Sequence, residues 1–132
     1  MAIYKDLAAR LLLTKVLVVD DEFYMRKVLH TLLTSIGVGT VYEAAQGAEG
    51  LEQIQRVAPD LVIVDWQMPK LDGPSFVRYV RSPETCRCPN VPIIMVTGHS
   101  ERARVVEAIE IGVNDFLLKP VSLKALEELL AG

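Results

Sequence analysis

Short apolar runs of strand length alternate along this chain with longer segments that have helical spacing. The strand-like runs cover residues 16–20, 40–44, 61–65, 92–96 and 114–118. Strands that alternate with helices predict βαβ units, which build a parallel sheet with right-handed crossovers. Residues 61–64 and 93–96 are apolar at every position, as expected of strands that are covered on both faces. The sequence therefore predicts an α/β fold, a five-stranded doubly wound parallel sheet in three α/β/α layers.

The helical segments are recognised by their apolar spacing and by the residues at their ends. They are predicted at residues 25–36, 47–58, from 73 onward, 100–111 and from 122 onward. In the first, apolar residues recur at i, i+3, i+4, i+7, i+8 and i+11 from Met25, and Gly37 follows as a helix C-terminus prefers. Ser100 and Ser122 are the predicted N-caps of the last two helices.

The chain divides into a short extension, residues 1–14, and one domain, residues 15–132. Ile3, Leu7 and Leu11, with Tyr4 beside them, form a helical stripe in the extension. One interpretation is a short helix packed on the domain, or a disordered tail. The other is a helix that mediates dimerisation or docking.

Composition excludes several classes of function. The net charge of −3 gives no reason to expect nucleic-acid binding, which usually requires a basic face. No apolar run approaches the roughly 18 residues that a membrane span needs. Residues 1–14 lack the pattern of a secretion signal, so the expected location is the cytoplasm. Cys86 and Cys88 have no second cysteine pair or nearby histidine, and we expect free, reduced loop thiols rather than a redox or metal site.

Polar side chains follow four of the predicted strands at the point where each strand ends. Asp20 closes the first strand and Asp21 follows it, Asp65 closes the third, Thr97 follows the fourth and Lys119 follows the fifth. Ligands bind at this edge of an open parallel sheet, and the doubly wound order 2-1-3-4-5 makes the first and third strands neighbours. Alone, each residue has an ordinary explanation as a helix cap, a turn residue or a solvated charge. Because all five residues lie at the same edge of the predicted sheet, they indicate a ligand-binding site.

Asp20, Asp21 and Asp65 are expected to lie within a few ångström of one another. Carboxylates that close repel, and one takes up a proton unless a cation lies between them. Mg²⁺ suits such a group, because it prefers oxygen ligands and keeps water positions that phosphate oxygens can fill. An aspartate can then act as nucleophile on phosphorus, while Lys119 neutralises charge and the Thr97 hydroxyl bonds a phosphoryl oxygen. No glycine-rich phosphate cradle is present, so a nucleotide donor is not expected.

Four motifs in this order resemble the receiver domain of bacterial two-component response regulators. They are Val-Val-Asp20-Asp21, Asp65-Trp-Gln-Met-Pro-Lys-Leu-Asp-Gly73, Met-Val-Thr97-Gly and Phe116-Leu-Leu-Lys119-Pro120. The resemblance covers residues 15–131 and is strongest to single-domain regulators of the chemotaxis type. It implies a flavodoxin-like fold, and it supports a cis bond between Lys119 and Pro120.

The resemblance also implies a role for each site residue. Asp65 would be the phosphorylated residue. The metal ligands would be Asp21 directly, Asp20 through water, Asp65 itself and the backbone carbonyl of Gln67. Thr97 and Lys119 would contact the phosphoryl group.

Two further positions follow from the resemblance. Thr97 would move toward the phosphate and let Phe116 swing inward, which would change the surface of the fourth helix, fifth strand and last helix. Phe116 lacks the hydroxyl that many relatives carry there as tyrosine. His99 is either an ordinary loop residue or a lid over the phosphoryl group.

The predicted function is a stand-alone receiver, either a phosphorylation-driven switch or a phosphoryl shuttle, and not an enzyme with a separate substrate. Its expected partners are a sensor histidine kinase or histidine phosphotransfer protein and a downstream protein target. We expect a monomer or weak dimer without direct binding to nucleic acid or membrane. The alternatives are the receiver half of a DNA-binding regulator, a docking module that is never phosphorylated, and an aspartyl-phosphate phosphohydrolase. The phosphohydrolase is disfavoured because Gln67 stands where such enzymes commonly carry a second acid.

Overall fold

A five-stranded parallel sheet forms the middle layer of the protein, in a computed structural model that describes residues 2–131 and the side chains of residues 6–98 and 101–131. The strands are β1 (Lys15–Val19), β2 (Thr40–Ala44), β3 (Leu61–Asp65), β4 (Ile93–Thr97) and β5 (Asp115–Leu118). Their order is β2-β1-β3-β4-β5, and every pairing is parallel. This confirms the predicted α/β class and strand order, with strand ends displaced by at most one residue.

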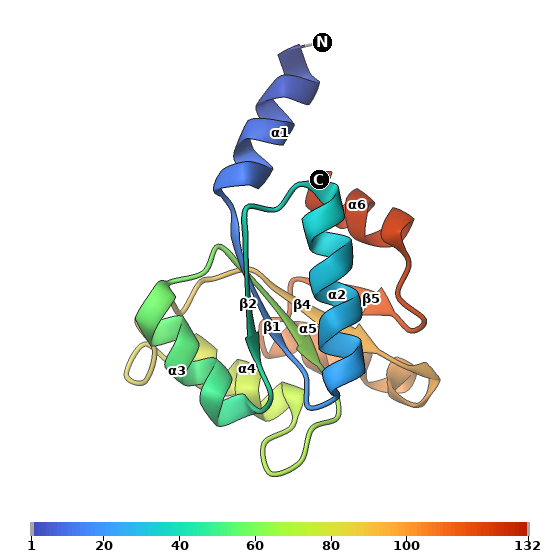
Figure 1. The fold of residues 1–132 in the computed structure, drawn as a ribbon. Helices are drawn as coiled ribbons and strands as arrows, with labels where there is room; N and C mark the ends of the chain where they lie inside the picture. The colour runs from blue at the N-terminus through green and yellow to red at the C-terminus, as the bar shows by residue number, and fades with distance from the viewer. Residues whose placement is uncertain (1, 132) are drawn as a thin grey trace.

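Helices cover both faces of the sheet (Figure 1). They are α1 (Ala2–Leu13), α2 (Phe23–Ile36), α3 (Gly47–Val57), α4 (Gly73–Arg81), α5 (Val105–Glu110) and α6 (Leu123–Ala131), with a 3₁₀ helix, η1 (His99–Arg104), before α5. Helices α2 and α6 pack on one face, and α3, α4 and α5 pack on the other. The fold is therefore the predicted three-layer, flavodoxin-like arrangement.

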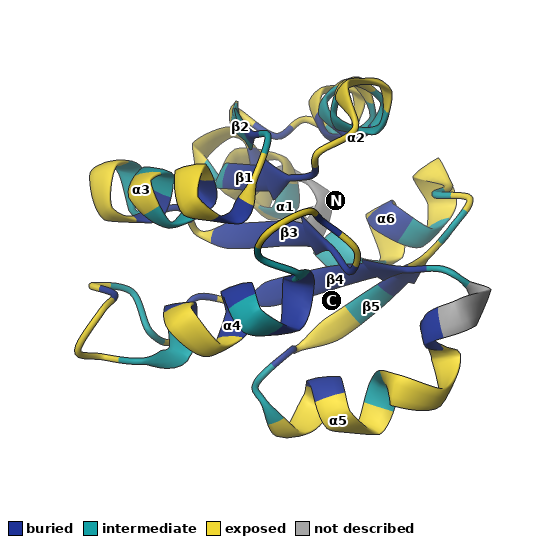
Figure 2. Cartoon of the chain, turned by 90° about the horizontal axis from the view of Figure 1, so that it is seen from below, coloured by how far each residue is buried: buried dark blue, intermediate teal, exposed yellow. Residues whose placement is uncertain are grey.

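The sheet separates two apolar cores. Along β1, Leu17 and Val19 face the core beneath α3, α4 and α5, whereas Val16 and Val18 face the core beneath α2 and α6. This alternation follows from the two-residue period of a strand. All five residues of β3 and of β4 are buried, because helices cover both faces there (Figure 2).

Two predicted helix ends are confirmed by their hydrogen bonds. Gly37 ends α2 in the left-handed region at φ 114°, and its N–H donates to Leu33 O and Thr34 O. At the start of α6, the Ala125 N–H donates to Ser122 Oγ over 3.1 Å.

The prediction of one α-helix capped by Ser100 is wrong in its first part. The chain winds as η1 over His99–Arg104, with Gly98 as N-cap, and only Val105–Glu110 is α-helical. Glu101 is buried at the end of β4, where its Oε1 accepts a hydrogen bond of 3.4 Å from the Gly98 N–H. Burial of this carboxylate depends on the end of the sheet, so the tighter 3₁₀ winding could not be read from local sequence.

Helix α1 extends away from the sheet at its N-terminal end (Figure 1). Near its C-terminal end, Leu11 is buried and Leu7 is half-buried against the α2–α6 core, and Leu11 O accepts a hydrogen bond of 2.9 Å from the Gly39 N–H. The side chains of Ile3 and Tyr4 lie outside the described residues. The role of the extension stays a prediction.

The loop between α4 and β4 carries both cysteines as free thiols. Cys86 is buried in the apolar core, and Arg81 holds the surrounding chain by donating to Pro89 O, Val91 O and Gly112 O over 2.6–3.0 Å. Within residues 2–131, no helix combines the length and apolarity that crossing a membrane requires.

Candidate functional site

The carboxyl ends of four strands meet at one edge of the sheet, held there by backbone hydrogen bonds. The Asp20 N–H donates to Ala44 O over 3.1 Å, and the Trp66 N–H donates to Val96 O over 3.1 Å. The Lys119 N–H donates to Thr97 O over 2.9 Å. The pairing thus continues one residue past β1, β3 and β5, and it positions the polar residues that follow these strands.

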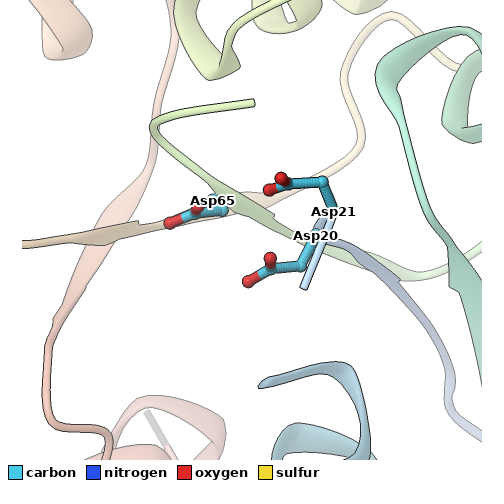
Figure 3. A group of neighbouring side chains, drawn as sticks. All are labelled: Asp20, Asp21 and Asp65. Carbon is cyan, nitrogen blue, oxygen red and sulfur yellow. The ribbon is translucent and has the colours of Figure 1, made fainter. Parts of the chain in front are cut away.

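Three carboxylates from this edge form one group. Asp20, Asp21 and Asp65 each offer an oxygen, and these oxygens lie within 4.8 Å of one another. Figure 3 shows that the side chains come from the ends of β1 and β3 and direct their carboxylates to the same side. Asp20 is 1% exposed and Asp65 is 4% exposed, whereas Asp21 is exposed. The three carboxylates therefore lie close together, as the sequence predicts.

Lys119 brings one positive charge to this group. Its Nζ lies 2.9 Å from Asp65 Oδ1, and the Lys119–Pro120 bond that follows is cis, as expected. Burial alone would lower the pKa of Lys119, but the hydrogen bond and the charge of Asp65 outweigh it and raise that pKa. Lys119 is therefore a firmly protonated ammonium beside the Asp65 carboxylate.

Burial also raises the pKa values of the two inner carboxyl groups. The pKa of Asp20 rises to about 6, because burial outweighs the hydrogen bond that its Oδ1 accepts from the Glu22 N–H. The pKa of Asp65 is raised by burial as well, and Lys119 opposes that rise. Both carboxylates are thus costly to keep charged without a cation beside them.

Two orphaned oxygen atoms show that the site fits a cation and an added polar group. Asp20 Oδ2 is buried and has no hydrogen-bond partner among the described residues. Thr97 Oγ1, at the end of β4, is also buried and has no hydrogen-bond partner among the described residues. Buried polar atoms are normally paired, so each position calls for a ligand. Three clustered carboxylates are the oxygen donors that Mg²⁺ prefers, and the residues present fit that ion.

The loop after Asp65 forms one wall of the site. Gly73 passes so close to Asp65 that a Cβ there would stand 2.5 Å from Asp65 O, and the Gly73 N–H donates to Trp66 O over 2.8 Å. Asp72 then caps α4 by accepting from the Ser75 N–H over 2.9 Å. Only glycine permits this return of the chain, which places Gln67 at the rim.

A cavity of about 600 Å³ opens above the carboxylates. Of the predicted site residues it is lined by Asp21, Asp65, Gln67 and Lys119. Thr97 is fully buried next to this cavity rather than in its lining. Phe116 lies apart: it is half-buried on β5 opposite Met95 and borders a second cavity, of about 390 Å³, along β5 and α6. The side chain of His99 lies outside the described residues.

Sequence reasoning missed two arginines at the site. Arg26 on α2 donates through Nη1 to Asp20 O over 2.7 Å and pairs through Nε with Glu43 Oε1 at 3.2 Å. Arg104, at the end of η1, lines the main cavity, and its guanidinium centre lies 5.0 Å from the centroid of the Trp66 ring. No motif marks either residue, because the orientation of α2 and the winding of η1 decide where they reach.

Comparison with known proteins places this geometry in a family. The family model described as "Response regulator receiver domain" matches residues 16–131. The chain is 38% identical over 117 residues to chemotaxis protein CheY1 of Helicobacter pylori, covering 88% of this chain and 93% of that one. The high-resolution structure of chemotaxis response regulator CheY4 of Vibrio cholerae superposes with a TM-score of 0.78 at 32% identity, covering 89% of this chain and 95% of that one.

A longer protein also matches. The probable transcriptional regulator ycf27 of Guillardia theta is 42% identical over 113 residues, which are 86% of this chain but 42% of that protein. The fold, the converging strand ends and the family match agree with one another. The chain belongs to the family of response regulator receiver domains, which act as phosphorylation-dependent switches.

Proposed function

We propose that this receiver takes a phosphoryl group onto Asp65 from a phosphohistidine of a sensor histidine kinase or histidine phosphotransfer protein. One observation carries the proposal: the buried Asp65 carboxylate lies both within 4.8 Å of the Asp20–Asp21 pair and 2.9 Å from Lys119 Nζ. Asp20, Asp21, Asp65 and the Gln67 carbonyl would hold Mg²⁺, whose charge supports phosphoryl transfer when it is bound. Asp65, Thr97 and Lys119 would be the catalytic residues.

The transfer itself uses groups that this chain supplies. An Asp65 oxygen attacks phosphorus and forms the new O–P bond, while the P–N bond of the phosphohistidine breaks and its electron pair stays on the imidazole. Lys119 neutralises charge on the phosphoryl oxygens, and the orphaned Thr97 Oγ1 donates to one of them.

The output we propose is a change in affinity for a protein partner at the surface formed by α5, β5 and α6. The motion of Thr97 toward the phosphoryl group would free space for Phe116, which is half-buried two residues before Leu118, the register partner of Thr97. Val106, Ile109 and Leu118 are exposed apolar side chains on this surface. An apolar surface next to Phe116 supports a protein target.

Transcriptional output is the second candidate. The match to the ycf27 protein, of which this chain spans 42%, supports a receiver that serves an attached output domain. Phosphorylation-dependent dimerisation through the same surface would favour this candidate, and a phosphorylated monomer would favour the first. Gel filtration in beryllofluoride separates the two.

The test of the proposed reaction is intact mass after incubation with acetyl phosphate. The wild-type protein is expected to gain one phosphoryl group in Mg²⁺ and none in EDTA. Absence of an adduct in Mg²⁺, together with no binding of beryllofluoride, would favour a docking module that is never phosphorylated. Because Trp66 is the single tryptophan and adjoins Asp65, its fluorescence provides a second readout.

Replacement of Lys119 should separate phosphorylation from the switch. The Lys119→Ala protein is expected to accept a phosphoryl group, since Asp65 and the acid pair remain. Its conformational response should fall by more than about half, because the ammonium that draws the phosphoryl group toward β5 is gone. Hydrogen exchange of residues 105–123, with and without beryllofluoride, measures that response. Lys124→Ala, an exposed change on α6, is the control, and an equal response in all three proteins would contradict the prediction.

A further inference from the structure

Arg104 reaches the phosphoryl site from an element that the proposed reaction does not otherwise use. It ends η1 and borders the same cavity as Asp65 and Lys119. Its guanidinium lies over the ring of Trp66, the residue directly after Asp65, at 5.0 Å from the ring centroid. Trp66 is buried, so its ring is held in place and orients the guanidinium at the cavity that Asp65 also lines.

The one ion pair of Arg104 that the structure shows is weak. Arg104 Nε and Nη2 each lie 3.4 Å from a carboxylate oxygen of Glu107, at the long end of hydrogen-bond distances. The two side chains are 48% and 46% exposed, and Arg78 also approaches Glu107, at 4.0 Å. Exposed pairs of this kind contribute little. The guanidinium therefore keeps most of its capacity to bind an anion.

The charges around the cavity make a second cation important. Its lining includes four acids, Asp21, Glu22, Asp65 and Asp72, against two bases, Arg104 and Lys119. Before any metal binds, a dianionic phosphodonor meets a net negative wall. Lys119 is already paired with Asp65 at 2.9 Å, which leaves Arg104 as the less committed base of this lining.

We propose that Arg104 is a second phosphoryl-binding cation of this receiver, which attracts the dianionic donor and then contacts the phosphoryl oxygens on Asp65. The planar guanidinium suits two phosphoryl oxygens at once, as lysine does not. This inference rests on the proposed phosphorylation of Asp65. It assigns to η1 a direct contact with the phosphoryl group, in addition to any effect through Thr97.

The experiment compares rates of phosphorylation by acetyl phosphate in Mg²⁺, read from intact mass, at about 50 mM and about 500 mM salt. Arg104→Gln is expected to lower the rate constant about three- to tenfold at low salt, and high salt should shrink that difference. Arg104→Lys should recover part of the loss. The affinity for Mg²⁺ alone should not weaken, because removal of a positive charge does not repel a cation.

Two controls separate anion binding from structural effects. Glu107→Gln breaks the ion pair but leaves Arg104 free, so its rate should equal or exceed that of wild type. Arg102→Gln removes an exposed arginine of the same 3₁₀ helix that does not line the cavity, and it should leave the rate unchanged. Urea midpoints establish that each variant is folded.

Three results would overturn the inference: an unchanged rate in Arg104→Gln, an equal loss in Glu107→Gln, or an equal loss in Arg102→Gln. If the wild-type protein is phosphorylated, each of these results contradicts this inference but not the proposed function. A wild type that gains no phosphoryl group overturns the proposed function and this inference with it.

Discussion

The Asp65→Asn protein is expected to gain no phosphoryl group under conditions in which the wild type gains one. The amide keeps the shape of the side chain but removes the nucleophilic oxygen and the charge that pairs with Lys119 Nζ at 2.9 Å. Asp20 does not line the cavity, and Lys119 pairs with Asp65 rather than with Asp21, so neither should substitute as acceptor. Loss of the adduct should be complete within the limit of intact-mass detection.

The matched control is Asp115→Asn. This carboxylate lies on β5 and is exposed, and it accepts a hydrogen bond of 2.9 Å from the Phe116 N–H, which an amide oxygen can also accept. The Asp115→Asn change removes the same negative charge as Asp65→Asn does, and it should leave the phosphoryl adduct on Asp65 intact. If the Asp65→Asn protein gains a phosphoryl group and peptide mapping locates it at another residue, the acceptor is misassigned.

Replacement of Asp20 by asparagine is expected to raise the stability of the metal-free protein and to lower its affinity for Mg²⁺. Burial raises the pKa of Asp20 from its usual 3.8 to about 6. Between these two values the folded protein holds more protons than the unfolded chain, so the stability of the metal-free protein falls as pH rises through this window. Above pH 6 the charged carboxylate destabilises the fold by on the order of 2–3 kcal/mol.

Asp20→Asn removes that penalty without losing the hydrogen bond of 2.8 Å from the Glu22 N–H, which the amide oxygen can accept. In EDTA the variant should therefore be about 2 kcal/mol more stable than wild type at pH 7.5, and equal to it near pH 4. Its affinity for Mg²⁺ should fall about 10–100-fold, as for loss of a residue that orients or holds a metal through water.

Urea denaturation at the two pH values and Mg²⁺ titration of Trp66 fluorescence measure both quantities. Equal stability of the two proteins at pH 7.5 in EDTA would show that burial does not strain this carboxylate. An unchanged Mg²⁺ affinity would remove Asp20 from the metal site.

Local patterns were sufficient to predict the architecture because each is set by residues close in sequence. The apolar runs of β3 and β4 mark strands covered on both faces, and Gly37 marks the end of α2. The topology rule for parallel sheets then brings Asp20, Asp21 and Asp65 together without knowledge of any side-chain contact. The roles of these residues stay proposals, which the variants above test.

The residues that sequence reasoning missed are those whose position depends on several elements at once. Arg26 reaches Asp20 O only because α2 packs across β1 and β2, where Glu43 holds its guanidinium. Arg104 lies over Trp66 at the end of η1, a 3₁₀ segment whose tighter winding places side chains differently from an α-helix. Such placements depend on the packing of distant segments, and the apolar spacing of residues 100–111 does not contain them.

Hydrophobic period was enough to predict the α/β class and the acids and lysine at the strand ends, and the strand order followed from the known doubly wound arrangement. The tertiary structure was needed to show how deeply Asp20 and Asp65 are buried, and hence which way their pKa values shift. It also decided that Arg104 lies over Trp66 at the cavity. Burial and side-chain reach are properties of the packed protein, since they depend on what every other element leaves uncovered.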